Sequence, residues 1–200
     1  MFYKTNISNL IKDVELRQPP VIITVNEFDE ETTQKFSELM CQAQNSGQKT
    51  IPIVIDSYGG QVYSLLSMIS MIKSSRIPVA TIIQGKAMSC GALLASFGTK
   101  GMRYMDPDST LMIHDVSSVA FGKVEELKSN ARESERLNKK LYKMMAENCD
   151  RPEDYFTDLI HDKGHADWFL EAEEALKHGI IDHVKIPELK INIDVDINLE

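Results

Sequence analysis

The chain has 200 residues, of which 42% are hydrophobic and 26% are charged, and this composition supports one folded domain and argues against global disorder. The formal net charge of −8 argues against nucleic acid and anionic membranes as main partners, because both recognise basic patches. No apolar run approaches the roughly 20 residues that span a bilayer. Residues 1–18 lack the apolar stretch of a secretory signal, so we expect a cytoplasmic protein.

The first half of the chain alternates short β-branched runs with helical patterns. A strand is predicted over residues 21–25, followed by a helix that Asp29 caps and that runs to about residue 45. A second strand is predicted over residues 51–55, and a second helix over residues 61–74, where apolar side chains recur at helical spacing.

A third buried strand is predicted over residues 79–84, followed by a turn at residues 85–88 and an apolar helix that begins near Ser89. The remaining predicted elements are a strand at 110–114, helices at 122–149 and 151–161, an extended piece at 167–170, a helix at 171–178 and a strand at 180–184. Strands that alternate with helices predict parallel βαβ units, and therefore an α/β fold.

Two parts of the chain depart from this alternation. Residues 128–136 of the long helix have almost no apolar face, so we expect them to project from the body. Residues 191–199 alternate apolar and polar side chains, which fits a half-buried or edge strand and equally a tail that orders only against a partner. The predicted organisation is an N-terminal extension over 1–20, one domain over 21–184 and a C-terminal tail over 185–200.

Ser89 stands where a predicted buried strand turns into an apolar helix. Such a turn exposes a hydroxyl and directs the amides of the helix N-terminus at the same point. Small residues such as Gly85 and Gly91 surround it, although Ala87 occupies the first glycine position of a Gly-x-Ser-x-Gly elbow. Local sequence alone favours a plain serine N-cap over a nucleophile.

Paired glycines and a histidine follow two other predicted strands. Gly59-Gly60 can present backbone N–H groups to a ligand, and we predict the N–H groups of Gly60 and Cys90 as an oxyanion hole. His114 ends a strand and can reach the end of a neighbouring strand. Asp115 should point to the opposite face, so it is a poor partner for this histidine.

Four separate motifs together resemble the proteolytic subunit of the Clp protease (the ClpP family). They are Ser57-Tyr58-Gly59-Gly60, residues 85–92 (Gly-Lys-Ala-Met-Ser-Cys-Gly-Ala), Met112-Ile113-His114 and Asp167-Trp168-Phe169-Leu170. The similarity covers roughly residues 21–184. It implies the ClpP/crotonase fold, an α/β fold of repeated ββα units, with the long helix as a projecting handle.

The resemblance also implies a function. Ser89 falls on the nucleophile of a serine endopeptidase, His114 on its general base and Asp167 on the acid that orients the histidine, while Gly60 and Cys90 fall on the oxyanion hole. A neutral imidazole near a serine hydroxyl can take its proton during attack, and an aspartate stabilises the imidazolium that forms. Such proteins need no metal or organic cofactor, stack as homo-oligomeric rings around a chamber, and receive unfolded polypeptides from an AAA+ unfoldase.

Several residues depart from the family pattern. Tyr58 stands where proline is usual, residues 115–120 contain neither the usual glycine nor proline, and Ala166 replaces an arginine that commonly precedes the acid. A catalytically inactive scaffold or adaptor therefore remains an alternative. A crotonase-like acyl-CoA enzyme would not need a serine at position 89. A peptidase that uses Lys86 as its base would leave His114 and Asp167 unexplained.

One further pattern in the sequence has the spacing of a metal site. His161 and His165 have the spacing of zinc ligands on a helix, but Gly164 weakens a helix and no glutamate follows the first histidine. We therefore interpret residues 161–165 as a solvated turn and predict no metal ligands.

Overall fold

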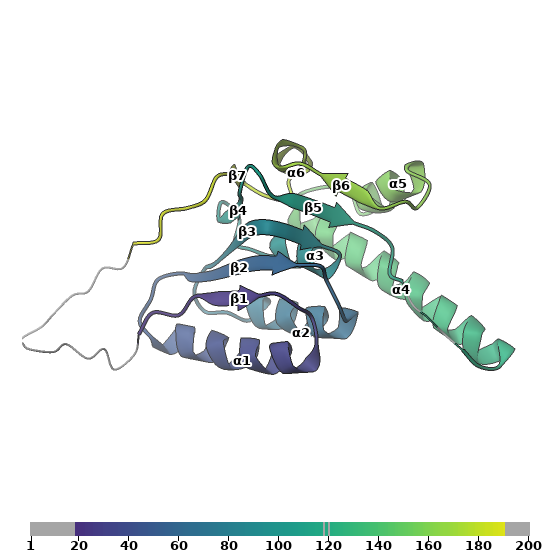
Figure 1. Ribbon diagram of the computed structural model, residues 1–200, viewed down its shortest axis with the longest axis horizontal. Coiled ribbons are helices and arrows are strands. Elements are labelled where there is room, and N and C mark those ends of the chain that lie inside the picture. The colour runs from purple at the N-terminus through teal and green to yellow at the C-terminus, as the bar shows by residue number, and fades with distance from the viewer. Residues whose placement is uncertain (1–18, 118, 120, 191–200) are drawn as a thin grey trace, which may run out of the picture.

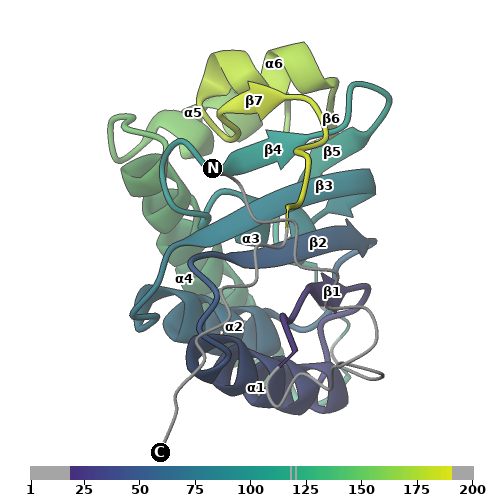
Figure 2. The same ribbon diagram turned by 90° about the vertical axis from the view of Figure 1, so that its left-hand side faces the viewer.

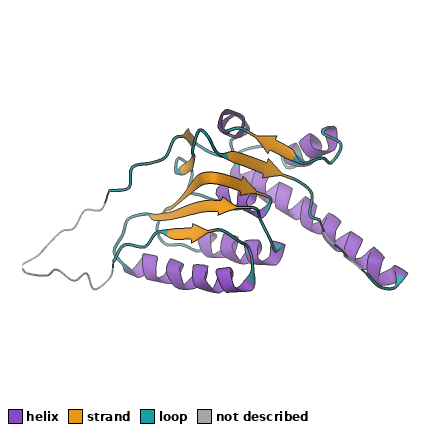
Figure 3. Ribbon diagram, viewed as in Figure 1, coloured by secondary structure: helices purple, strands orange, loops and turns teal. Residues whose placement is uncertain are grey.

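The computed structural model describes residues 19–190, except 118 and 120. The strands in this part of the chain are β1 (Ile23–Val25), β2 (Ile51–Ser57), β3 (Val79–Met88), β4 (Arg103–Met105), β5 (Thr110–Ile113), β6 (Trp168–Leu170) and β7 (His183–Val184). Its helices are α1 (Glu30–Asn45), α2 (Val62–Lys73), α3 (Cys90–Ala95), α4 (Val124–Asn148), α5 (Tyr155–Asp162) and α6 (Ala172–His178). The predicted α/β class is confirmed (Figure 3).

The described strands form one sheet, in which β1, β2, β3, β4 and β7 follow one another in space (Figure 1). β5 pairs with β3 and with β6. Every pairing among the described strands is parallel except that of β5 with β6, which is antiparallel. β3 is the central strand, because its first half pairs with β4 and its second half pairs with β5 on the same side.

The predicted turn at residues 85–88 is wrong, because β3 continues through it to Met88. Gly85 takes a positive φ of 87°, and the register with β2 shifts between Ile55 and Ser57. A glycine inside a strand often marks a bulge, and this bulge keeps the strand paired while bending it. The consequence for function is that Ser89 follows directly on a paired strand.

The helical cover explains which side chains form the core. Figure 2 shows α2, α3 and α4 behind the sheet. Ile51, Ile53 and Ile55 of β2 are fully buried, whereas Pro52 and Val54 on the opposite face are only half-buried. This alternation is the period-two pattern of a strand with one better-covered face.

Sequence signals for helix ends are confirmed in two places. The Asp29 carboxylate caps α1 by accepting a 2.7 Å hydrogen bond from the N–H of Thr32, and this bond lowers the pKa of Asp29. Gly179 ends α6 in the left-handed conformation, with φ 78°, which costs glycine nothing sterically.

β4 was not predicted, and the strand predicted over 180–184 is regular only at its end, in β7. What fixes this side of the sheet is a buried ion pair. The Arg103 guanidinium donates to both carboxylate oxygens of Asp182, at 2.9 and 2.6 Å. The Asp182 carboxylate also accepts from the backbone N–H groups of Gly101 and Arg103.

The long helix α4 extends away from the body (Figure 1). Its buried side chains begin only at Leu137, so its first half is exposed, as the lack of an apolar face predicts. Tyr63 of α2 supports it by donating a 2.6 Å hydrogen bond to Glu133, which also pairs with Arg136. Hydrogen bonds from Arg136 and Tyr63 lower the pKa of Glu133 to about 2.

Two predictions concern parts of the chain that the structure leaves untested. Residues 1–18 and 191–200 lie outside the described residues, so the alternatives for the tail and the domain boundaries stay predictions. Within the described residues, every helix is too short or too polar to cross a membrane.

Candidate active site

Ser89 occupies a sharp turn between β3 and α3, since it is the single residue between them. Its backbone has φ 54° and ψ −118°, outside the regions that non-glycine residues usually adopt. Its N–H donates to the carbonyl of Met112 at 2.8 Å. A strained strand-to-helix turn of this kind exposes the hydroxyl of a nucleophilic serine in other folds. Here the turn forms although Ala87 stands where those folds have glycine.

The glycine pair lies against this serine. A Cβ atom added to Gly59 would lie 2.7 Å from the Cβ of Ser89, and one added to Gly60 would lie 2.5 Å from the carbonyl oxygen of Phe28. Neither position can therefore hold a side chain without a shift. The buried Ser57 hydroxyl accepts a 3.1 Å hydrogen bond from the N–H of Gly59 and fixes the loop.

The two predicted oxyanion donors flank Ser89. Cys90 begins α3, and the first N–H groups of a helix have no partner within it. Its thiol donates to the carbonyl of Gly60 at 3.3 Å, and burial raises the pKa of Cys90 to about 11. A neutral thiol therefore connects the glycine loop to the start of α3.

His114 and Asp167 are brought together by strand register. Leu111 pairs with Leu170 and Ile113 with Trp168 in the antiparallel β5–β6 pair, so the next position along places His114 opposite Asp167. Nδ1 of His114 lies 3.6 Å from Oδ1 of Asp167, and their side chains are 23% and 56% exposed. The aspartate is thus more exposed in the single chain than a triad acid usually is.

Ser89 and His114 line one pocket, together with Gly60 and Cys90. Its other lining residues are Val62, Leu93, Val116, Ser117, Asn138, Leu141 and Tyr142. Among the described residues, no hydrogen bond joins the Ser89 hydroxyl to His114. Catalytic hydrogen bonds in ligand-free sites are often long and tighten when substrate binds.

Sequence reasoning missed the contribution of α4 to this pocket. Asn138 accepts a 2.6 Å hydrogen bond from the N–H of Val116, and Tyr142 donates to Asp115 at 3.0 Å. Asp115 has no ion pair with His114 and instead lies 2.7 Å from Nδ1 of His165. The available signal was the helical spacing of Asn138, Leu141 and Tyr142 at the base of a helix whose first half is charged.

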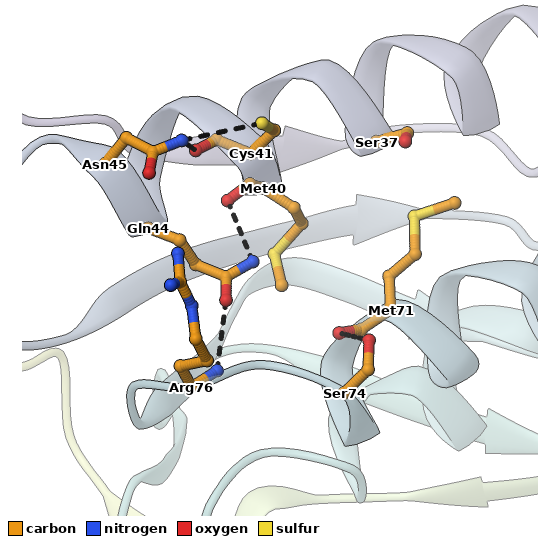
Figure 4. A pocket seen from close by; sticks show the side chains of 8 residues that line it. All are labelled: Ser37, Met40, Cys41, Gln44, Asn45, Met71, Ser74 and Arg76. Carbon is orange, nitrogen blue, oxygen red and sulfur yellow. Dashed lines mark hydrogen bonds between the residues drawn. The ribbon is translucent and has the colours of Figure 1, made fainter.

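A second pocket lies between α1 and the end of α2 (Figure 4). It is lined by Ser37, Met40, Cys41, Gln44, Asn45, Met71, Ser74 and Arg76. Figure 4 shows Gln44 bonded to the backbone of Arg76 and of Met40. No predicted site residue lies there, and the pocket offers neither a carboxylate nor a histidine for acid–base chemistry.

The close approach at Gly59 makes a testable prediction. We expect Gly59→Ala to slow acylation of Ser89 by at least about 100-fold, because the new methyl group would displace the serine and a small misplacement of a reacting group costs about that much. Gly47→Ala is the matched control, since Gly47 also has a positive φ, of 83°, but nothing within 4 Å of the added atom. Equal acylation rates in the two variants would contradict this role of Gly59.

The candidate residues share one edge of the sheet. Gly60 follows β2, Ser89 follows β3 and His114 follows β5, all at carboxyl ends of parallel strands, where ligands bind in open α/β sheets. Asp167 precedes the antiparallel β6 and so reaches the same edge. A serine, a histidine and an aspartate therefore lie at the same edge of the sheet.

Comparison with known proteins identifies the family. Residues 7–188 match the Clp protease family model. The chain is also 36% identical, over 146 residues, to the ATP-dependent Clp protease proteolytic subunit of Deinococcus radiodurans, an alignment that covers 73% of this chain and 69% of that relative. The chain belongs to the Clp protease family and is a ClpP-type peptidase.

Proposed function

We propose that this chain is a serine endopeptidase that hydrolyses peptide bonds through an acyl-enzyme on Ser89. The observation that carries the proposal is the strand pairing around the site. The Ser89 N–H bonds to Met112, two residues before His114, and the β5–β6 register continues to Asp167 opposite His114. These pairings bring the three residues to one edge of the sheet, which supports the proposal.

In the proposed mechanism, His114 takes the hydroxyl proton of Ser89 as the serine oxygen attacks the scissile carbonyl carbon. The N–H groups of Gly60 and Cys90 stabilise the oxyanion of the tetrahedral intermediate. The histidine then gives the proton to the leaving amine as the carbon–nitrogen bond breaks, and water hydrolyses the ester in the same way. Asp167 lies on the Nδ1 side of His114, which leaves Nε2 for the serine.

We further propose that the chain acts as a homo-oligomer of stacked rings with the ClpP/crotonase repeat and α4 as its handle. The exposed apolar side chains of Val124 and Leu127 at the start of α4, and of Phe121 just before it, support a protein contact there. Unfolded polypeptides would be the substrates, an AAA+ unfoldase the partner and the cytoplasm the location. A sedimentation coefficient of a monomer at micromolar concentration would contradict the oligomer.

Labelling with a fluorophosphonate, which reacts with activated serines, tests the catalytic proposal. We expect a single adduct on Ser89, located by peptide mass spectrometry, and none in the His114→Ala variant. Label that persists in His114→Ala would contradict the role of the histidine as base.

A non-enzymatic scaffold is the second candidate. Its support is the 3.6 Å separation between His114 and Asp167 and the 56% exposure of the aspartate side chain, together with the missing bond between Ser89 and His114 in the described residues. A folded, oligomeric wild type that takes no label, with or without a candidate unfoldase, would favour the scaffold over the peptidase.

A further inference from the structure

A second histidine–aspartate pair lies beside the candidate triad. His165 Nδ1 is 2.7 Å from Oδ2 of Asp115. Asp115 is one residue after His114, and His165 is two residues before Asp167. We propose that the Asp115–His165 pair is a positioning device that holds Asp167 against His114 during acylation of Ser89. This inference rests on the proposed peptidase function.

The first step of the argument is that Asp167 has little support of its own. Within the described residues, His114 is its sole ion-pair partner, at 3.6 Å, and its side chain is more than half exposed. β6 begins only at Trp168, so the exact position of Asp167 depends on the turn that precedes it.

The second step is the conformation of that turn. Gly164 and His165 have φ values of 67° and 58°, and the N–H of His165 bonds to the carbonyl of Ile160 at 3.0 Å. A non-glycine residue in the left-handed region is uncommon and persists where its surroundings hold it. Within the described residues, the polar contact of the His165 side chain is the one with Asp115.

The third step is that Asp115 is anchored from the other side. Its Oδ1 accepts a 3.0 Å hydrogen bond from the hydroxyl of Tyr142, a buried residue of α4 that lines the same pocket as Ser89 and His114. The pair therefore connects the α5–β6 turn to β5 and α4, and the pocket wall fixes one end of it.

The surroundings contribute other rings and charges, but none competes for Asp115. The His161 ring lies edge-on to His165, with ring centroids 5.4 Å apart. Lys163 lies over the ring of Trp168, 4.9 Å from its centroid. Neither residue has an ion pair with Asp115 in the described part of the chain, so replacing His165 removes a specific contact.

A positioning role and a contribution to global stability differ in the size of the effects that they predict on the reaction rate and on Tm. The side chains of His165 and Asp115 are 58% and 30% exposed, and ion pairs this exposed contribute little to global stability. An ångström of misplacement at a reacting group can nevertheless slow a reaction about 100-fold. The pair should therefore affect the rate of acylation and leave the thermal midpoint Tm unchanged.

The test measures the rate at which a fluorophosphonate inactivates the full chain, as a function of reagent concentration. This dependence gives two parameters, the maximal inactivation rate and the reagent concentration at which half of that rate is reached. We expect His165→Ala to lower the maximal rate roughly tenfold, with an unchanged half-maximal concentration and Tm. His165→Asn should restore most of the rate, because the asparagine amide offers an N–H donor near the place of Nδ1 and tolerates a positive φ. Asp115→Asn combined with His165→Ala should be no slower than the slower single variant.

His161→Ala is the matched control, because it removes the neighbouring ring without touching Asp115. Three outcomes would overturn the positioning role. In the first, His165→Ala reacts as fast as His161→Ala; in the second, His165→Asn reacts no faster than His165→Ala. In the third, the Tm of His165→Ala falls together with its rate. A folded, oligomeric wild type that takes no label on Ser89, with or without a candidate unfoldase, would overturn the peptidase function itself, and this inference with it.

Discussion

The His114→Ala variant is expected to hydrolyse peptides about 10⁴- to 10⁶-fold more slowly than the wild type, which is the loss typical of removing the base from a serine–histidine pair. Without the imidazole, no group in the pocket can take the Ser89 proton at neutral pH. The measurement is kcat for a short fluorogenic peptide. The variant should retain its Tm, since His114 follows β5 and lies outside the buried core.

Two further variants make this prediction specific. Because nucleophile and base act as a unit, Ser89→Ala combined with His114→Ala should be no slower than either variant alone. Asp167→Asn should lose less activity than His114→Ala, since the aspartate is half-exposed and lies 3.6 Å from the histidine. Losses that multiply in the double variant would contradict a shared catalytic step.

Removing the Asp182 carboxylate should give the largest loss of stability outside the hydrophobic core. Asp182→Asn leaves the Arg103 guanidinium, whose side chain is 6% exposed, buried without its counter-ion. Breaking such a pair by removing one partner costs on the order of 3 kcal/mol, which lowers Tm by roughly 6–12 °C for a chain of this size. Thermal unfolding followed by circular dichroism measures the change.

The matched control is Asp150→Asn. Asp150 also pairs with a cation, Lys100, but both side chains are largely exposed, so its replacement should leave Tm nearly unchanged. Asparagine also suits the positive φ at this position. If the two variants lost equal stability, the loss at Asp182 would not come from burial of the pair.

The same pair predicts the direction of a pH effect. Burial disfavours the charged carboxylate of Asp182, but hydrogen bonds and charge from Arg103 outweigh it and lower the pKa of Asp182. A carboxylate with a lowered pKa stabilises the fold above its unfolded value of about 4, and this contribution is lost as the pH falls through the folded pKa. The difference in Tm between wild type and Asp182→Asn should therefore shrink below about pH 4.

The residues of the candidate site are easier to recognise in the sequence than the strands around them. Ser89, His114 and Asp167 stand in short motifs whose order and spacing are visible without coordinates. β4 has three residues, too few for a periodic pattern. Gly85 predicts a turn in the sequence, because glycine is common both in turns and in bulges, and only pairing with a neighbouring strand distinguishes the two.

Polar contacts between residues far apart in the sequence cannot be predicted from local patterns. Arg103 and Asp182 are 79 residues apart, as Tyr63 and Glu133 are 70 apart, and no local pattern links such residues. Strand alternation predicts that Asp115 is a poor partner for His114, but its contacts with Tyr142 and His165 depend on the packing of α4 and of the α5–β6 turn.

The strands that carry the candidate site residues differ in how completely they are paired, and therefore in local stability. β3 is hydrogen-bonded on both sides along most of its length, whereas β6 is a three-residue strand whose one partner among the described residues is β5. Proteins open locally in units whose free energies fall well below that of global unfolding, and short, singly paired edges are the first to open. Ser89 is attached to the most persistent strand and Asp167 to one of the least, so the site can come apart while the sheet that carries its nucleophile stays folded.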